Sequence, residues 1–600
     1  MMRAANMMAV ERERVGEGGR DRFGPREAAV CALLVGLFVG VRVWRLDASC
    51  LWFDEVFSVH AARHGWGGLL EFVALDLIHP PLFYLLLKVW VALVGGEAVW
   101  WLRLFAALAE TAAVAPFLLL CRELGVRGGG VVRLALLLLA VNGYLIQHAQ
   151  QLRMYGLLLF FALCSLWLFA RFWGAEERSG GWGAAFALFV ANLLLVYTHY
   201  FGWLLVGLEG VFLVVWGRGK LKAFAVSLVA LGVCFSPWVW LVWRAAGEGA
   251  GLAQNIGWTA RPSLPDILQP FLLLHEPFRF RRNTFEPVVL RVDVWLAFAV
   301  FAPPFVALGW RALRRRRAGA QSRGDEAAPD AAAGGDAGGH SPVRETGGDS
   351  SGRNTGAHSS GRDTGAALSA RDAGGRSPLT FLLFFSLSPV VVAFVLARVL
   401  PQSIWGTRHL IIIAPAYLLL AAAALVSLRR PAWLAVTLKL LLACWLTLAA
   451  MLWLVRRDAP PVWCAWETLA QRVVEADAGK GGEVRVYAVE DLVAYHLWYG
   501  LQSSTGEGRF RVVAVRNLPG VAEDRAFFLP RGFDEVTAVD AAAGMREDHF
   551  WVAFRDAHDA SAEHPLLRLL AERGYETATR FEVAASGQRA FVISAQRRAR

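Results

Sequence analysis

Long apolar runs recur along most of the chain and are separated by short basic clusters. A run of about 20 apolar residues forms a helix long enough to span the hydrocarbon core of a bilayer. Hydrophobic residues make up 56% of the 600 residues and charged residues only 18%, which is too apolar for a soluble protein of this length. The sequence therefore predicts a mainly α polytopic transmembrane helical bundle, with membrane lipid as a partner.

The basic clusters set the expected orientation of this bundle. A formal net charge of +11 could suit nucleic acid, but Lys and Arg lie mainly between apolar runs, where they mark the cytoplasmic side. We therefore expect no nucleic-acid partner. If the N-terminus is cytoplasmic, the clusters after residues 101–120, 203–216 and 294–310 all fall on the cytoplasmic side, and hydropathy gives about eleven spans.

One apolar stretch, Leu82 to Val94, does not fit the spacing of a span. It follows Pro80-Pro81 and ends at Gly95-Gly96, and its length is too short for a hydrocarbon core of about 30 Å. The alternation of the later basic clusters also requires that it does not cross. We expect it to be re-entrant or interfacial, together with an amphipathic helix in the first outer loop.

Composition divides the chain into five parts. The segment 318–377 consists mainly of Gly, Ala, Ser, Asp, Arg and Thr, so it buries too little apolar surface to fold by itself. After residue 456, helix-like and strand-like runs alternate, which predicts a small α/β domain. The predicted parts are a cytoplasmic tail (1–27), a transmembrane catalytic module (28–317), a disordered cytoplasmic linker (318–377), C-terminal transmembrane helices (378–455) and an extracytoplasmic α/β domain (456–600).

The α/β domain contains no recognisable catalytic motif. Its strand-like runs lie at 483–489, 511–515, 549–554 and 591–594, and we interpret Asp491, His496 and His549 as ordinary surface or loop residues. Cys50 and Cys464 are both expected on the extracytoplasmic side. The sequence leaves open whether they pair.

Two adjacent carboxylates, Asp54 and Glu55, follow the first apolar run. Acidic groups held against a membrane surface by aromatic neighbours are functional candidates by default. Neighbouring residues in a helix point in different directions, so we expect Asp54 to react while Glu55 orients it or binds another group. The structural alternative is that Asp54 only caps the following helix.

Other polar residues are expected at the same outer face, although they are far apart in the sequence. They offer guanidinium, imidazole, phenol and amide groups beside the carboxylates. An Arg at a span end is often only a membrane anchor, but together these residues predict one site: Gln150, Gln151, Arg153, Tyr155, His199, Tyr200, Arg408 and His409.

The order of these motifs resembles the GT-C glycosyltransferases. The motifs are Asp54-Glu55, the His-Pro-Pro-Leu element at 79–82, Gln-Gln-Leu-Arg-Met-Tyr at 150–155, Thr-His-Tyr at 198–200 and Gly-Thr-Arg-His-Leu at 406–410. They are most similar to the branch that contains the protein O-mannosyltransferases and the lipid A aminoarabinose transferases. The resemblance extends from residue 28 to residue 428 apart from the linker; one departure is Gln150-Gln151, where many relatives carry Gln-Glu.

The resemblance implies an inverting transfer of a sugar from a polyprenyl-phosphate donor to an extracytoplasmic acceptor. It implies Asp54 as general base assisted by Glu55, and Arg153 and Arg408 on the donor phosphate, with His79 and Lys88 nearby. Substrate binding is expected at Gln150, Tyr155, His199, Tyr200 and His409. Some relatives use a divalent metal ion, so a metal at Asp54 or Glu55 is left open.

Two other classes of protein are compatible with an apolar chain of this kind. A transporter or flippase of lipid-linked sugars would also have many spans, but internal repeats and broken helices near the midplane are typical of transporters. The sequence has no evident repeat, and its polar candidates gather at one face. The other alternative is a membrane scaffold that presents the α/β domain as a binding module. Removing that domain distinguishes the two, because an enzyme should keep part of its sugar-transfer activity.

Overall fold

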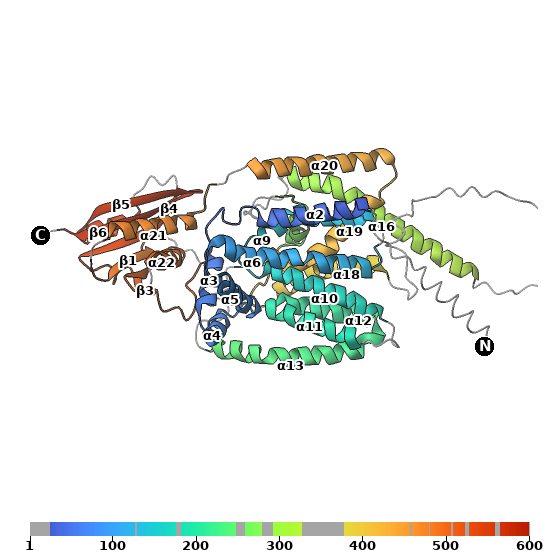
Figure 1. The fold of residues 1–600 in the computed structure, drawn as a ribbon, viewed down its shortest axis with the longest axis horizontal. Coiled ribbons are helices and arrows are strands. Elements are labelled where there is room, and N and C mark those ends of the chain that lie inside the picture. The colour runs from blue at the N-terminus through green and yellow to red at the C-terminus, as the bar shows by residue number, and fades with distance from the viewer. Residues whose placement is uncertain are drawn as a thin grey trace, which may run out of the picture.

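The computed structural model describes residues 25–126, 129–175, 182–247, 259–278, 292–326, 377–455, 459–478, 481–505, 508–521, 527–557 and 564–598. A bundle of helices forms the body of the molecule, and a sheet domain built from the C-terminal residues lies at one end of it (Figure 1). The expected fold class, a polytopic helical bundle with a small C-terminal α/β domain, is confirmed.

Seven helical segments of the described chain are long and apolar enough to cross a membrane. They are Val99–Glu123 (α6 and α7), Tyr155–Gly174 (α10), Arg218–Ala246 (mainly α13), Val294–Arg314 (within α16, Val292–Glu326), Pro378–Val399 (α18), Thr407–Ser427 (η4 and α19) and Ala432–Val455 (α20). The chain is therefore a multi-pass membrane protein.

The expected count of about eleven spans is not confirmed. Three predicted spans form shorter helices: α8 (Gly129–Val141), α11 (Trp182–Thr198) and α12 (Phe201–Trp216). The first predicted span forms a helix at Pro25–Val43 that is not among the seven. The run predicted over 131–145 is interrupted because Asn142 accepts a hydrogen bond from the Leu145 amide (3.0 Å) and begins a separate helix, α9 (Gly143–Ala149).

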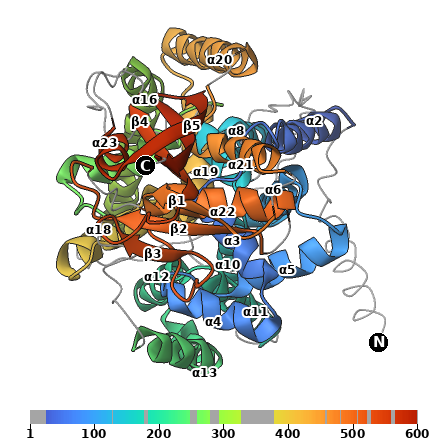
Figure 2. The same cartoon turned by 90° about the vertical axis from the view of Figure 1, so that its left-hand side faces the viewer.

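Burial separates the central helix from the peripheral helices. In α19, 94% of the apolar window is buried, against 17% in α13 and 11% in α20. Figures 1 and 2 place α13 and α20 on opposite sides of the bundle. Apolar side chains on these two helices therefore face outward, as lipid-facing residues do.

A buried ion pair joins α2 (Pro25–Val43) to the bundle. The Arg42 guanidinium contacts the Glu110 carboxylate at 2.8 Å, and it also donates to the backbone carbonyls of Leu139 and Ala140. Both charged side chains are fully buried, so removing one partner would leave an uncompensated charge. This pair fixes α2 against α6 and α8.

Three short helices lie between the bundle and the sheet domain: α3 (Phe53–Arg63), α4 (Trp66–Asp76) and α5 (Leu82–Val94) (Figure 1). The bounds of α5 are those expected for the re-entrant or interfacial helix. It begins after Pro80-Pro81 and ends at Gly95 in a left-handed conformation (φ 69°), which glycine adopts at no steric cost.

The C-terminal domain contains a six-stranded sheet in the order β3-β2-β1-β4-β6-β5. The first four strands of this order are parallel and the last two pair antiparallel. The strands are β1 (Val484–Val489), β2 (Phe510–Arg516), β3 (Thr537–Asp540), β4 (His549–Ala557), β5 (Tyr575–Ala585) and β6 (Gln588–Arg597).

Helices cover both faces of this sheet. α21 (Ala465–Ala476) and α22 (Asp491–Thr505) pack on one face, and their apolar core, which includes Trp466 and Tyr495, is continuous with the core of the helical bundle. α23 (Pro565–Glu572) packs on the other face in a separate core with Phe550 and Leu566. The domain is therefore docked on the bundle through the face that carries α21 and α22, and α22 contacts α3.

A disulfide between Cys50 and Cys464 fastens this docked arrangement. It answers the question of pairing that the sequence left open. Beside it, the ring of Phe53 contacts that of Tyr495 (centroids 5.2 Å apart). His496 also lies here and is buried beside Phe53, so its expected place on the domain surface is wrong.

Two predicted segments fall largely outside the described residues: residues 1–24 of the tail and residues 327–376 of the linker. Residues 318–326, which composition assigned to the linker, continue the helix α16.

Candidate active site

The site is organised by the first turn of α3, where the two adjacent carboxylates point in different directions. Trp52 occupies the N-cap position of this helix, and its backbone amide donates to Glu55 Oε2 at 2.9 Å. Glu55 therefore closes the helix start, a role usual for an acid at the third helical position. The structural alternative considered for Asp54, a helix cap, is taken by its neighbour.

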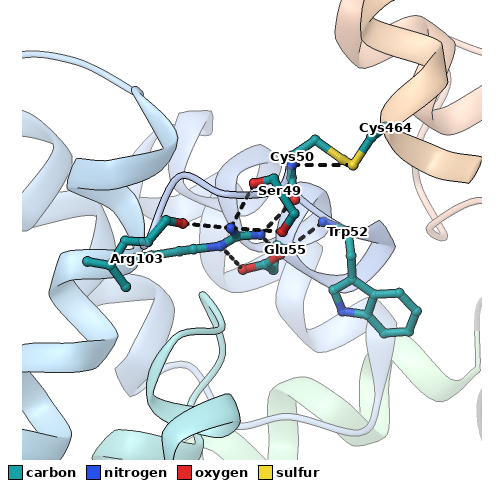
Figure 3. The surroundings of a disulfide bond; sticks show 7 residues. Ser49, Cys50, Trp52, Glu55, Arg103 and Cys464 are labelled. Carbon is teal, nitrogen blue, oxygen red and sulfur yellow. Dashed lines mark hydrogen bonds and ion pairs between the residues drawn. A yellow bond between two sulfur atoms is a disulfide. The ribbon is translucent and has the colours of Figure 1, made fainter. Parts of the chain in front are cut away.

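Glu55 is fully engaged by donors, as Figure 3 shows in part. Arg103 on α6 donates to both of its oxygens, at 2.9 and 2.8 Å, and the Leu152 amide donates to Oε1 at 2.7 Å. Arg103 also binds the carbonyls of Leu46, Ser49 and Cys50. With 1% of its side chain exposed, Glu55 joins α3, α6 and two loops.

Asp54 has a looser and more open environment than Glu55. Its Oδ2 lies 3.8 Å from Arg153 Nε and 3.8 Å from Arg408 Nη1. These distances are longer than hydrogen bonds, and 28% of the side chain is exposed. The structure thus brings together three residues that the sequence assigned to one site from widely separated positions.

Arg153 is the centre of a buried network. Nη1 donates to the Asp54 backbone carbonyl at 3.1 Å and lies 3.5 Å from the Tyr84 hydroxyl, while Nη2 lies 3.1 Å from His79 Nε2. Only 4% of the Arg153 side chain is exposed, against 34% for Arg408. Arg408 is therefore the more accessible of the two guanidinium groups.

His79 connects this network to a further acid, Asp76. His79 Nδ1 lies 2.8 Å from Asp76 Oδ2. Burial, together with the Arg153 charge, holds the pKa of His79 well below its usual value, so its ring is neutral at physiological pH. Because the Arg153 guanidinium can only donate, His79 Nε2 must accept and Nδ1 must carry the proton to Asp76.

Burial raises the pKa of Asp76 to about 7, although the Arg153 charge opposes the shift. Asp76 therefore changes charge near neutral pH, and its hydrogen bond from His79 is stronger when the carboxylate is ionised. Asp76 was not among the residues predicted from the sequence. The sequence feature that could have indicated Asp76 is its place as an acid three residues before His79, at the end of an apolar helix.

Three side chains near this network carry buried polar atoms that lack a hydrogen-bond partner in the described structure: Tyr155 Oη, His199 Nε2 and His409 Nδ1. The rings of His199 and His409 are 5.0 Å apart, and His199 lies 6.1 Å from the His79 ring. His199 Nδ1 accepts from the Phe201 amide, so Nε2 carries the proton. These atoms are suited to hydroxyl groups of a ligand.

Gln150, Lys88 and Tyr200 have other partners. The Gln150 amide donates to backbone carbonyls at the end of α2, including that of Val41 at 3.0 Å. Lys88 Nζ donates to the carbonyls of Ala62 and His64 at the end of α3. The Tyr200 hydroxyl accepts from Trp238 Nε1 at 3.0 Å.

The residues beside Asp54 do not fit a metal ion. Arginines face its carboxylate, and Glu55 is occupied by Arg103 and backbone amides. Across the described ranges, no group of three His, Cys, Asp or Glu side chains is arranged to hold a metal.

Comparison with solved structures identifies the architecture. The chain is similar to ArnT from Cupriavidus metallidurans bound to undecaprenyl phosphate, with a TM-score of 0.52, 14% sequence identity, and coverage of 94% of this chain and 97% of that chain. The chain has the ArnT fold. The apo ArnT structure matches with a TM-score of 0.50, 15% identity, and coverage of 94% and 98%.

This likeness to ArnT is one of fold, and it agrees with the expected helical bundle with a C-terminal α/β domain. It extends over the helical bundle and the C-terminal domain, since nearly the whole of both chains is matched. No protein-family model matches the chain, and no curated protein matches it.

Proposed function

We propose that this protein is a membrane glycosyltransferase that moves a sugar from a polyprenyl-phosphate donor to an acceptor hydroxyl or amine on the extracytoplasmic side. The observation that carries the proposal is the Asp54 carboxylate, partly exposed and placed between Arg153 and Arg408. This arrangement occurs on the fold of ArnT, which has been solved with undecaprenyl phosphate.

Asp54 is suited to act as the general base. In a single displacement, the acceptor oxygen or nitrogen forms a bond to the anomeric carbon while the bond from that carbon to the phosphate oxygen breaks. The acceptor proton passes to the Asp54 carboxylate, and the polyprenyl phosphate leaves with the electron pair. Attack from the face opposite the phosphate inverts the anomeric configuration.

Arg408 is suited to the leaving phosphate because a planar guanidinium binds two phosphate oxygens and stabilises the charge that develops there. Arg153 is less available, since its nitrogens already contact Asp54, His79 and Tyr84. We assign it to positioning Asp54 and to supplying positive charge. His79 then orients Arg153 and does not bind phosphate as a cation.

Tyr155, His199 and His409 are proposed to bind the sugar. Their buried polar atoms without described partners would gain hydrogen bonds from hydroxyl groups, and an unmade hydrogen bond at such an atom costs about 1–3 kcal/mol. A neutral imidazole is suited to this role; burial lowers the pKa of His199 well below its usual value.

The Cys50–Cys464 disulfide supports the extracytoplasmic placement of Asp54. Disulfides persist in oxidising compartments and are rare in the cytosol. Cys50 precedes Asp54 by four residues, so the two share one side of the membrane. The basic clusters independently favour the same side.

The proposal is tested with purified protein in lipid nanodiscs and a panel of polyprenyl-phosphate sugars. We expect release of free polyprenyl phosphate that depends on an added acceptor and is lost in Asp54→Asn. A flippase would move the lipid-linked sugar between leaflets without consuming it. If the lipid-linked sugar moved between the leaflets and was not consumed, the protein would be a transporter and not a glycosyltransferase.

A further inference from the structure

One short segment of the C-terminal domain, Leu529 to Phe533, packs on the helices α3 and α4 beside the site. Phe533 packs on the His60 ring of α3 with centroids 4.9 Å apart. At the start of the segment, the Leu529 amide donates to Asp491 at 2.9 Å. Both ends are thus fixed, one to the domain and the other to α3.

Gly532 brings this segment into close contact with α4. A Cβ atom added at Gly532 would lie 2.7 Å from Leu75 Cδ1, and the residue has a φ of +68°. Any side chain here would both collide with α4 and adopt an unfavourable backbone conformation. The contact lies directly beside Asp76, the residue that follows Leu75 in the chain.

Arg531 precedes Gly532 and places its positive charge near Asp76. Its guanidinium atom Nη1 is buried, and its charge lowers the pKa of Asp76 against the effect of burial. The other charged or titratable groups that act on Asp76 or are acted on by it are Asp54, His79, Tyr84, Arg153, Tyr200 and Tyr495.

We propose that Arg531 is a positioning residue of the active site that the C-terminal domain supplies. It favours the ionised form of Asp76; the ionised Asp76 holds the Nδ1–H tautomer of His79, and His79 Nε2 holds Arg153 beside Asp54. The inference rests on the proposed function for its catalytic consequence. It also means that the domain forms part of the site and is not merely carried by the bundle.

The test compares pH profiles of kcat/KM for the lipid-linked donor. In the wild type we expect activity to rise with pH through about 7 as Asp76 ionises. In Arg531→Gln the midpoint should move to higher pH, because the charge that opposes protonation is gone, and activity should recover at pH 9. A shift of one unit changes activity about tenfold on the acidic side. Arg531→Lys should restore the midpoint.

Arg580→Gln is the matched control. It removes the same charge from the same domain, but Arg580 pairs with Glu582 and packs over Phe591 within the sheet. Its profile should coincide with that of the wild type. An unchanged midpoint in Arg531→Gln, or an equal shift in Arg580→Gln, would overturn the inference.

Thermal unfolding provides a readout that does not require sugar transfer. A carboxyl whose pKa is raised by folding takes up protons in the folded state, so stability falls as pH rises toward the folded pKa. In Arg531→Gln this fall should extend to higher pH, and adding Asp76→Asn should abolish the difference. If Arg531→Gln shows this shifted pH dependence of unfolding but the wild type consumes no lipid-linked sugar, the proposed function is wrong and the Arg531–Asp76 coupling is supported. If the shift is missing, the coupling fails.

Discussion

Two carboxylate–arginine sites lie side by side at the start of α3, and they differ in almost every physical property. Glu55 and Arg103 are buried and joined by two short hydrogen bonds. Asp54 is partly exposed and lies 3.8 Å from each of two arginines. The charges of Glu55 and Arg103 are satisfied within the protein, while the looser contacts of Asp54 leave its carboxylate accessible to a substrate.

Adjacent residues of the same chemical type thus differ in role because their surroundings differ. Glu55 could bind a substrate only by giving up Arg103, whose buried charge would then lose its partner. Asp54 can accept a proton without breaking any short hydrogen bond of its side chain. We therefore propose a catalytic role for Asp54 and a structural role for Glu55, where the resemblance implied that Glu55 assists Asp54.

The largest expected effect comes from Asp54→Asn. The amide keeps the shape of the side chain but cannot act as a base, so the rate of transfer should fall by about 10²–10⁴. The midpoint of thermal unfolding should change little, because a first-turn acid contributes only about 0.3–1 kcal/mol through the helix dipole. A variant within about threefold of the wild-type rate would remove Asp54 from the mechanism.

Glu55→Gln should lower the stability of the protein more than its rate of sugar transfer. It leaves the buried Arg103 guanidinium without its carboxylate, and breaking such a pair costs about 3–5 kcal/mol. We expect a clear fall in the unfolding midpoint, with transfer per folded molecule reduced less than in Asp54→Asn. If Glu55→Gln were as stable as the wild type but inactive, the two acids would share the chemistry.

Arg408→Lys should weaken transfer by about 10- to 100-fold, since a hydrogen bond to a charged group contributes about 1.5–3 kcal/mol. The charge is kept, but the two-point contact with phosphate is lost. Arg103→Lys is the matched variant from the neighbouring site and should mainly lower the unfolding temperature. Full activity in Arg408→Lys would leave Arg408 as a membrane anchor.

Lys88→Gln should have the smallest effect. Lys88 binds the last carbonyls of α3, so its loss should cost about 1 kcal/mol of stability and leave the KM for the donor near the wild-type value. A large rise in that KM would support the donor-phosphate role that the resemblance implied for Lys88.

The sequence predicted the members of the site better than their roles. Asp54, Arg153 and Arg408 were grouped because the topology placed them at one face, and the structure brings them together. Arg103 was missed, although an arginine inside an apolar run needs a buried partner. The pairing of Glu55 with Arg103 depends on the packing of α3 against α6, which spacing along the chain does not reveal.

The same limit applies to the sheet domain. β1, β2, β4 and β6 were anticipated because buried central strands are apolar runs. β3 and β5 are the edge strands; β3 has four residues and β5 is largely polar, with little buried surface. Edge strands need fewer apolar residues, so their sequences resemble loops.

The Cys50–Cys464 disulfide also orders the biogenesis of the protein. The two cysteines are 414 residues apart, and every described helix of the bundle from α3 to α20 lies between them in the chain. During synthesis, Cys50, just before α3, is made long before Cys464, which follows the last of these helices. Closure of the disulfide therefore requires that every described helix of the bundle has been made, so the start of α3 is covalently joined to the sheet domain only after the last of these helices.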